Sequence, residues 1–271
     1  VVALRRRANP AVAGFLKSPM ENVAAEAARA IHDDWMIEKA MPALASSLTD
    51  TKWLKNESLI RRAINANFHL GTLKHANRVA TYAAQTEIPE QLRLDALDAL
   101  GKWTNPEDLD RIVGRYRLRE DRNPQISKAA ILPQLTKLLT DPSQKIQSKA
   151  MGLARSQKIK MSAATLIAVS SSKTSLLELR IEALRALASQ KHPDLKAILT
   201  TTMKAKSDDL RIIALKLLAE TDSEAALEFT QHLLHQKNGS TREKQASLDL
   251  LSQDLASKNG DKILQALIGS F

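Results

Sequence analysis

The sequence contains no cysteine, and only 3% of its 271 residues are aromatic. The absence of cysteine excludes disulfides, thiol nucleophiles, cysteine-ligated zinc and covalently attached haem within this segment. It leaves the compartment undetermined, because chains of several compartments lack cysteine. No apolar run approaches the about 18 residues that a membrane-spanning helix requires, so we predict no membrane span.

Glycine and proline are also scarce, with 8 and 9 copies, while alanine and leucine dominate the apolar residues. Sheet proteins are rich in β-branched and aromatic residues and in turn glycines, whereas alanine, leucine and long charged side chains favour helix. The composition therefore predicts an all-α chain. Residues 1–7 are too short for a signal peptide and resemble the end of a helix, so we expect a fragment of a longer chain.

One pattern recurs along the chain, in which an alanine has apolar residues four positions before and after it. Five of the six spacings between successive alanines are 31–36 residues, and one is 54. A period in the low thirties is typical of a helix–turn–helix repeat. The alanines are Ala27, Ala63, Ala96, Ala150, Ala183, Ala214 and Ala246.

The alanine has a physical role, because a small residue in the middle of an apolar helix face lets a neighbouring helix approach closely. We predict a right-handed α-α superhelix of the HEAT or armadillo type, with about seven helix pairs in one domain over residues 1–271. The second helices of the pairs are expected at residues 37–48, 73–84, 163–169, 195–203 and 225–234.

The wide spacing between Ala96 and Ala150 predicts an insertion of roughly 20 residues, which we place at 101–124. The whole net charge of +10 lies in residues 111–173, where 13 basic residues accompany 3 acidic ones. Insertions in solenoids often form the contact site. The candidate partner-binding residues combine positive charge with one aromatic side chain: Arg111, Arg115, Tyr116, Arg117, Arg119 and Arg122.

Three strings go beyond a generic helical repeat: residues 26–33, residues 61–71, and residues 99–103 with 110–117. In order and spacing they resemble the HEAT-like segment of large multidomain dehydrogenases of planctomycete and verrucomicrobial bacteria. The resemblance covers about residues 1–125. In that family a β-propeller precedes the solenoid and a c-type cytochrome domain follows it. The resemblance implies an extracytoplasmic, membrane-associated parent protein in which this segment spaces or orients redox domains.

No redox residue of that family carries over, since covalent haem requires cysteine. We find no nucleophile elbow and no phosphate-binding glycine loop. The pair His232 and His235 shares a helix face with Glu228, but two histidines alone are weak evidence for a metal site. We therefore expect a non-enzymatic module with no catalytic residue, no metal and no cofactor, which binds protein partners or flanking domains.

The alternative is a nucleic-acid-binding protein related to the HEAT-like DNA glycosylases. Arginines at equivalent repeat positions and several aromatic residues favour it, although arginine ladders in solenoids also pair with acidic groups of the next repeat. The arginines are Arg93, Arg180 and Arg211; the aromatic residues are Trp35, Trp53, Trp103 and Tyr116. Asn65 and Asn67 fall on a face that is apolar elsewhere. We expect the Asn67 amide to bond to backbone at an inter-repeat turn near Gly71, the other interpretation being a binding pocket on the concave face.

Overall fold

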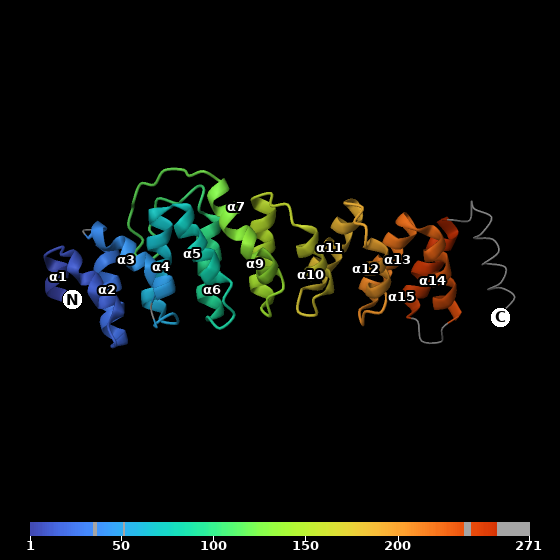
Figure 1. Ribbon diagram of the computed structural model, residues 1–271, viewed down its shortest axis with the longest axis horizontal. Helices are drawn as coiled ribbons and strands as arrows, with labels where there is room; N and C mark the ends of the chain where they lie inside the picture. Colours follow the sequence, from blue (N-terminus) through green and yellow to red (C-terminus); the bar gives the residue numbers. More distant parts are fainter. Residues whose placement is uncertain (35–36, 51, 236–239, 254–271) are drawn as a thin grey trace. The chain divides into compact units, whose positions relative to one another are not determined.

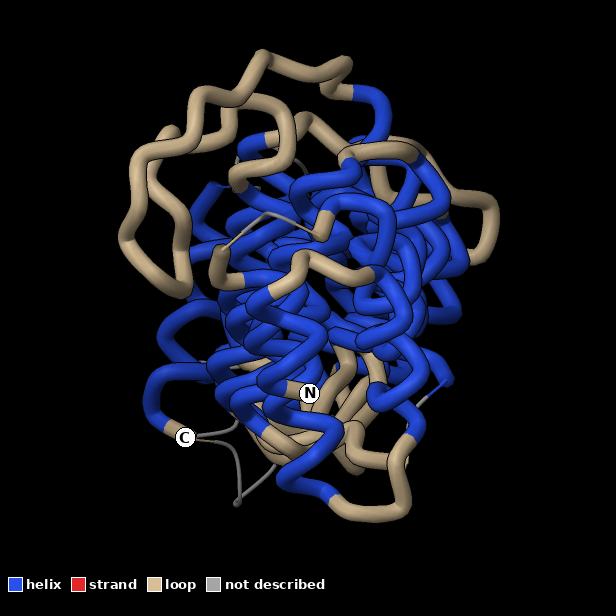
Figure 2. The backbone as a smooth tube through the Cα atoms, turned by 90° about the vertical axis from the view of Figure 1, so that its left-hand side faces the viewer, coloured by secondary structure: helices blue, strands red, loops and turns tan. Residues whose placement is uncertain are grey.

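The structure is a computed structural model that describes residues 1–34, 37–50, 52–235 and 240–253. Within these ranges it contains fifteen α-helices and three 3₁₀ helices, with no strand beyond an isolated bridge between Leu109 and Tyr116 (Figures 1 and 2). The predicted all-α solenoid class is thereby confirmed. The chain divides into two compact units, residues 1–160 and 161–271, while the single-domain assignment stays a prediction.

The helices of each unit follow one another as packed pairs. Those of unit 1 are α1 (Val2–Arg6), η1 (Pro10–Lys17), α2 (Glu21–His32), η2 (Glu38–Ala40), α3 (Met41–Asp50), α4 (Glu57–Leu70), α5 (Leu73–Ala83), α6 (Glu90–Gly101), α7 (Gln125–Ile131), η3 (Leu132–Gln134), α8 (Leu135–Leu139) and α9 (Gln144–Ser156). Those of unit 2 are α10 (Ala163–Ser171), α11 (Leu177–Ser189), α12 (Leu195–Thr202), α13 (Asp208–Thr221), α14 (Ser223–His235) and α15 (Thr241–Gln253).

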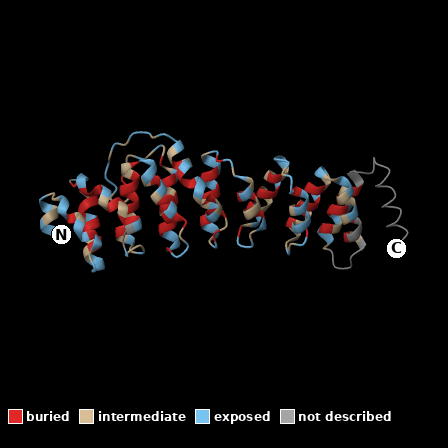
Figure 3. Ribbon diagram, viewed as in Figure 1, coloured by how far each residue is buried: buried red, intermediate tan, exposed pale blue. Residues whose placement is uncertain are grey.

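All seven repeat alanines are buried, one each in α2, α4, α6, α9, α11, α13 and α15. Each of these helices contacts the next one within its unit, so the alanines lie where anchored helices pack together. The buried residues follow the inward-facing sides of the helices (Figure 3). The repeat read from the sequence is therefore the packing repeat of the structure.

The second helices lie where the spacing predicts them, with two differences. The segment 37–48 is divided between η2 and α3. The repeat anchored by Ala96 has a second helix that the sequence analysis did not assign, and it is split into α7, η3 and α8. Pro133 lies at the split, where it can neither donate a backbone hydrogen bond nor fit an uninterrupted helix.

The arginine ladder has a structural role at helix ends. Arg93 in α6 is buried, and its Nε donates to the carbonyl of Ala83 at the end of α5 (2.8 Å). Its guanidinium also pairs with the buried carboxylate of Asp141, which precedes α9. The last carbonyls of a helix lack partners within that helix, so a side chain from the next helix that donates to them stabilises the stacked arrangement.

In unit 2, Arg180 repeats the carbonyl contact of Arg93 without a carboxylate partner among the described residues, and Arg211 donates to a carbonyl in the loop that follows α12. Arg180 Nε donates to the carbonyl of Ser170 (2.9 Å), and Arg211 Nη1 donates to the carbonyl of Ala205 (2.5 Å). Arg211 also pairs with Glu243 of the following repeat. The ladder thus links consecutive repeats, as solenoid arginines commonly do.

We expect Arg93→Ala to lower the free energy of unfolding by about 3–5 kcal/mol, because it leaves a carboxylate buried without its cation. Urea unfolding followed by circular dichroism measures the change. The exposed Arg185→Ala in α11 is the matched control and should change stability by less than about 0.5 kcal/mol. The double substitution with Asp141→Ala should recover part of the loss; strictly additive effects would contradict the pairing.

Candidate functional site

The longest connection in unit 1, residues 102–124, leaves α6 and arches over α3, α4 and α5 before α7 begins (Figure 1). We call this segment the strap. It matches the predicted insertion at 101–124 except that Gly101 is the last residue of α6. The strap is attached at both ends and in the middle, and each attachment uses a helix end of the repeats beneath it.

Aromatic and cationic side chains attach the two ends of the strap to the C-terminal end of α4. Trp103 is fully buried and its Nε1 donates to the carbonyl of Gly71 (3.2 Å), while its ring meets Phe68 edge-on at 5.5 Å. The guanidinium of Arg122 lies over Phe68 at 5.0 Å and donates to the carbonyl of His69 (3.5 Å). Gly71 has a φ of +70°, a backbone conformation that favours glycine, and a Cβ there would lie 2.7 Å from Arg122 Nε and so displace this side chain.

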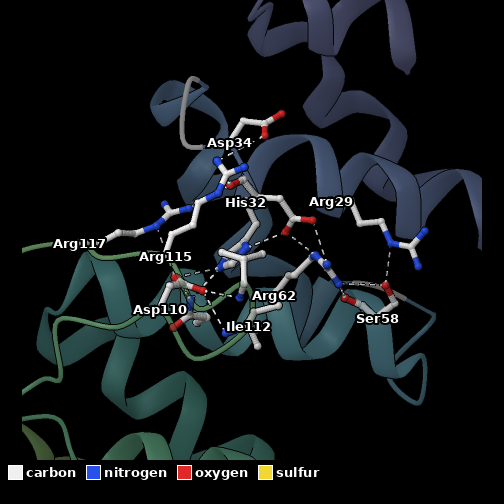
Figure 4. Close-up of polar contacts among 12 residues, drawn as sticks. Arg29, His32, Asp34, Ser58, Arg62, Asp110, Ile112, Arg115 and Arg117 are labelled. Atoms are coloured by element: carbon white, nitrogen blue, oxygen red, sulfur yellow. Dashed lines mark hydrogen bonds and ion pairs between the residues drawn. The ribbon is translucent and has the colours of Figure 1, made fainter.

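Asp110 organises the middle of the strap. Its side chain is fully buried and accepts hydrogen bonds from the backbone N–H groups of Ile112 (3.0 Å) and Val113 (3.1 Å). Asn65 Nδ2 in α4 also donates to it (2.7 Å), and Arg119 Nη2 lies 3.3 Å away. The carboxylate thus holds a tight turn of the strap and joins that turn to α4 (Figure 4).

The network continues from Asn65 into α2. Asn65 Nδ2 lies 2.7 Å from Nε2 of the buried His32, whose Nδ1 lies 2.9 Å from a carboxylate oxygen of Asp33. With the amide as donor, His32 accepts at Nε2 and carries its proton on Nδ1. Arg62 completes the chain by donating to both oxygens of Asp33 (2.8 and 2.9 Å). Asp33 is the C-cap residue of α2.

Both carboxylates of this network are ionised at neutral pH. Burial alone would raise the pKa of Asp33, but hydrogen bonds from His32 and Arg62 outweigh it and hold the pKa well below its ordinary value. Burial likewise opposes ionisation of Asp110, and the N–H groups of Val113 and Ile112 together with the Asn65 amide lower its pKa. The strap is therefore fastened by charge-assisted hydrogen bonds.

The structure separates the predicted partner-binding residues into two sets. The guanidiniums of Arg117, Arg119 and Arg122 turn inward: Arg117 Nη2 donates to the carbonyl of Asp33 (3.0 Å), and Arg119 lies over Phe68 at 5.0 Å. Arg115 and Tyr116 are exposed. The expected surface of five arginines around one aromatic is thus absent, because most of these arginines fasten the strap from within.

Arg111, the remaining residue of the set, lines a cleft of about 460 Å³ beside the strap. The cleft also contains Asn65 and Arg62 from α4 and Asp95 from α6. Two buried polar atoms in its wall, Asn65 Oδ1 and Arg111 Nη1, have no hydrogen-bond partner among the described residues. Both atoms are closed to solvent, so the cleft does not present them to a partner group.

Most other candidates take structural roles. Asn67 Nδ2 donates to the carbonyls of Ala45 (2.7 Å) and Ala63 (2.8 Å), so the amide bonds to backbone as expected, but within α3 and α4 and not at the turn near Gly71. Trp53 Nε1 donates to the carbonyl of Ser18 (3.1 Å). Trp35 and the side chains of His232 and His235 lie outside the described residues. In the part of the chain that the structure describes, no three His, Asp or Glu side chains are grouped as metal ligands, and no helix is long and apolar enough to cross a membrane.

The sequence analysis missed Asp110 and His32 as the centre of the site. Asp110 lies 45 residues from Asn65, and no repeat spacing connects the two. The local signal was an aspartate four residues before Gly114, which has a φ of +64° and whose N–H donates to the Asp110 carbonyl (2.8 Å). Aspartate followed by a left-handed glycine is typical of a tight turn, so the turn was accessible from sequence but its partners were not.

We expect Asp110→Asn to release the strap, because an amide cannot accept all the hydrogen bonds of the carboxylate and leaves the inward arginines without their charge partner. Limited trypsin digestion should cut the strap arginines at least about tenfold faster, since local opening governs cleavage. The exposed Asp121→Asn on the same strap is the control. Equal cleavage rates for the two variants would show that Asp110 does not hold the strap.

A pH dependence follows from His69 at the end of α4. Burial, together with the positive charges of Arg119 and Arg122, lowers the pKa of His69 to about 4 from its ordinary value of 6.5. Between those values the unfolded chain binds a proton at His69 that the folded chain does not. The free energy of unfolding should therefore fall as the pH falls through this window.

His69→Gln should remove this contribution, so the stability of the variant should change less than that of the parent across the same pH range. Urea unfolding at several pH values measures it. His192→Gln in unit 2 is the control. Parallel pH profiles for the parent and His69→Gln would contradict the assignment.

Comparisons with known proteins do not assign this chain to a family. No protein-family model matches the sequence, and a search of curated proteins finds no significant match. The resemblance of residues 1–125 to the HEAT-like segment of multidomain dehydrogenases therefore stays a prediction.

Proposed function

We propose that this chain is a non-catalytic binding module that holds a protein partner on the outer face of the strap. One observation carries the proposal: Leu109, Tyr116 and Leu118 are 59%, 68% and 78% exposed on a segment whose inner side is fastened by the Asp110 network. Single exposed apolar side chains are common on protein surfaces. A group of them in one short segment, however, is typical of an interaction site.

The fastening matters for affinity, because a segment that is already ordered loses little conformational entropy when it binds. Tyrosine and arginine are also enriched at the centres of protein interfaces. Arg115 lies beside Tyr116 in sequence and its side chain is 63% exposed, but its Nη1 lies 3.8 Å from Asp34 and donates to the carbonyl of Asp33 (3.4 Å). We therefore expect a partner surface with an apolar patch opposite Tyr116 and Leu118.

The family resemblance adds a candidate for the partner. If this segment belongs to a multidomain dehydrogenase, the partner is a flanking domain of the same polypeptide, and the module orients redox domains in an extracytoplasmic protein. The nucleic-acid alternative has less support, because Arg93, Arg180 and Arg211 donate to backbone carbonyls of the solenoid. The buried Trp103 likewise presents no ring for stacking.

The test is photo-crosslinking in the source cells, with a photoreactive amino acid at position 116 of the native polypeptide. We expect one dominant crosslinked product, in a protein or in another domain of the same chain, and mass spectrometry identifies which. Position 185 on the exposed side of α11 is the matched control. Leu118→Asp should reduce the yield at position 116 at least about tenfold, as loss of a central apolar contact does.

The intact mass of the crosslinked species and its covalent haem content test the dehydrogenase parent separately. A crosslink to nucleic acid at position 116, or equal yields at positions 116 and 185, would contradict the protein-binding proposal.

A further inference from the structure

A second pocket, in unit 2, is lined by positive side chains from the ends of three helices. It has a volume of about 830 Å³ and lies between α10, α12 and the start of α11. Its basic residues are Lys173, Arg180, Lys204 and Lys206, and no Asp or Glu is among the described residues that line it. The three lysines are exposed and Arg180 is partly buried, so their positive charge is accessible to an anion from solution.

The repeat itself shows that a carboxylate is missing here. In unit 1, Arg93 Nε donates to a carbonyl ten residues earlier, and its guanidinium pairs with Asp141. In unit 2, Arg180 Nε donates to the carbonyl of Ser170, again ten residues earlier. The position equivalent to Asp141 is Ala205, since each lies nine residues before the next repeat alanine.

Backbone hydrogen bonds support this equivalence. The carbonyl of Asp141 accepts from Gln147 Nε2 (2.5 Å), and the carbonyl of Ala205 accepts from Arg211 Nη1 (2.5 Å). Both donors lie six residues after the carbonyl. Ala205 therefore occupies the structural place of Asp141, and its methyl group lies in the wall of the pocket where unit 1 has a carboxylate.

Acidic residues near the pocket are already engaged. Asp208 pairs with Arg211, and Asp209 pairs with Arg242. Lys173, Lys204 and Lys206 form no ion pair with any residue in the described ranges. Burial lowers the pKa of Arg180, with no carboxylate to offset it. The charge of the pocket is thus left for a ligand to neutralise.

We propose that this pocket binds a small organic phosphate, whose phosphate group takes the place of the missing carboxylate beside Arg180. A phosphate carries up to two negative charges and three strong acceptor oxygens, so it matches a guanidinium flanked by lysines better than a single carboxylate does. The volume exceeds the needs of one phosphate, which leaves room for an organic group.

The experiment is isothermal titration calorimetry of the 271-residue chain at low ionic strength. The probes are inorganic phosphate, pyrophosphate, adenosine 5′-monophosphate and glucose 6-phosphate. We expect at least one of the two organic phosphates to bind with a Kd below about 1 mM and more tightly than inorganic phosphate. Arg180→Gln should weaken that binding at least about tenfold, whereas Arg185→Gln, exposed on the same helix, should not.

Ala205→Asp is the decisive variant, because it restores the carboxylate that unit 1 has beside Arg93. It should abolish phosphate binding and leave the Tm equal to or above that of the parent. An unchanged Tm would show that binding is lost because the carboxylate occupies the site and not because the protein unfolds. Titration with a duplex DNA of about 20 base pairs distinguishes a polyanion surface from a small-ligand site.

Three results would overturn the proposal. The first is the absence of binding tighter than about 10 mM for every phosphate probe. The second is binding that Ala205→Asp leaves unchanged. The third is Arg180-dependent binding of DNA that is tighter than that of any small phosphate. None of these outcomes bears on the strap, so the proposed protein-binding role is tested independently.

Discussion

The carbonyl groups at helix C-termini impose the constraint on which this structure depends. Stacked helix pairs bury the ends of many helices, and each end exposes carbonyls that lack partners within their own helix. In this molecule arginine side chains supply the donors, because a guanidinium can reach a neighbouring repeat and still donate to a second group. Arg93 donates to a carbonyl at the end of α5, Arg117 to the carbonyl of the residue that caps α2, and Arg122 to a carbonyl in the last turn of α4.

A guanidinium buried at a helix end carries a positive charge, and this charge is unfavourable unless a carboxylate lies nearby. Asp141 balances Arg93, and Asp110 lies among the arginines under the strap. The strap is thus held in place by the same chemistry that joins the repeats. Its outer side is left with Tyr116 and Leu118 exposed, which is why an apolar surface can be presented on a connection without regular secondary structure.

In unit 2 the balancing carboxylate is absent from the described residues, and the proposed phosphate ligand would supply the negative charge. Arg180 keeps the carbonyl contact of Arg93, and Ala205, at the position equivalent to Asp141, lines the same pocket. A comparison of equivalent positions in two repeats therefore separates Arg93, whose charge a carboxylate balances, from Arg180, which has no carboxylate partner among the described residues. Neither charge counting nor the total of +10 makes that distinction, since all of these residues are basic.

The sequence by itself determined the helical class, the repeat and the seven packing alanines, because helix propensity and a period in the low thirties are local properties of the chain. It also indicated the position of the strap, because the spacing between Ala96 and Ala150 is longer than the repeat period. Only the tertiary structure decided which strap arginines face inward, and that His32, Asn65 and Asp110 meet. These contacts join residues 33 and 45 positions apart, and the loop path that brings them together is set by packing against α2 and α4, which no periodic pattern encodes.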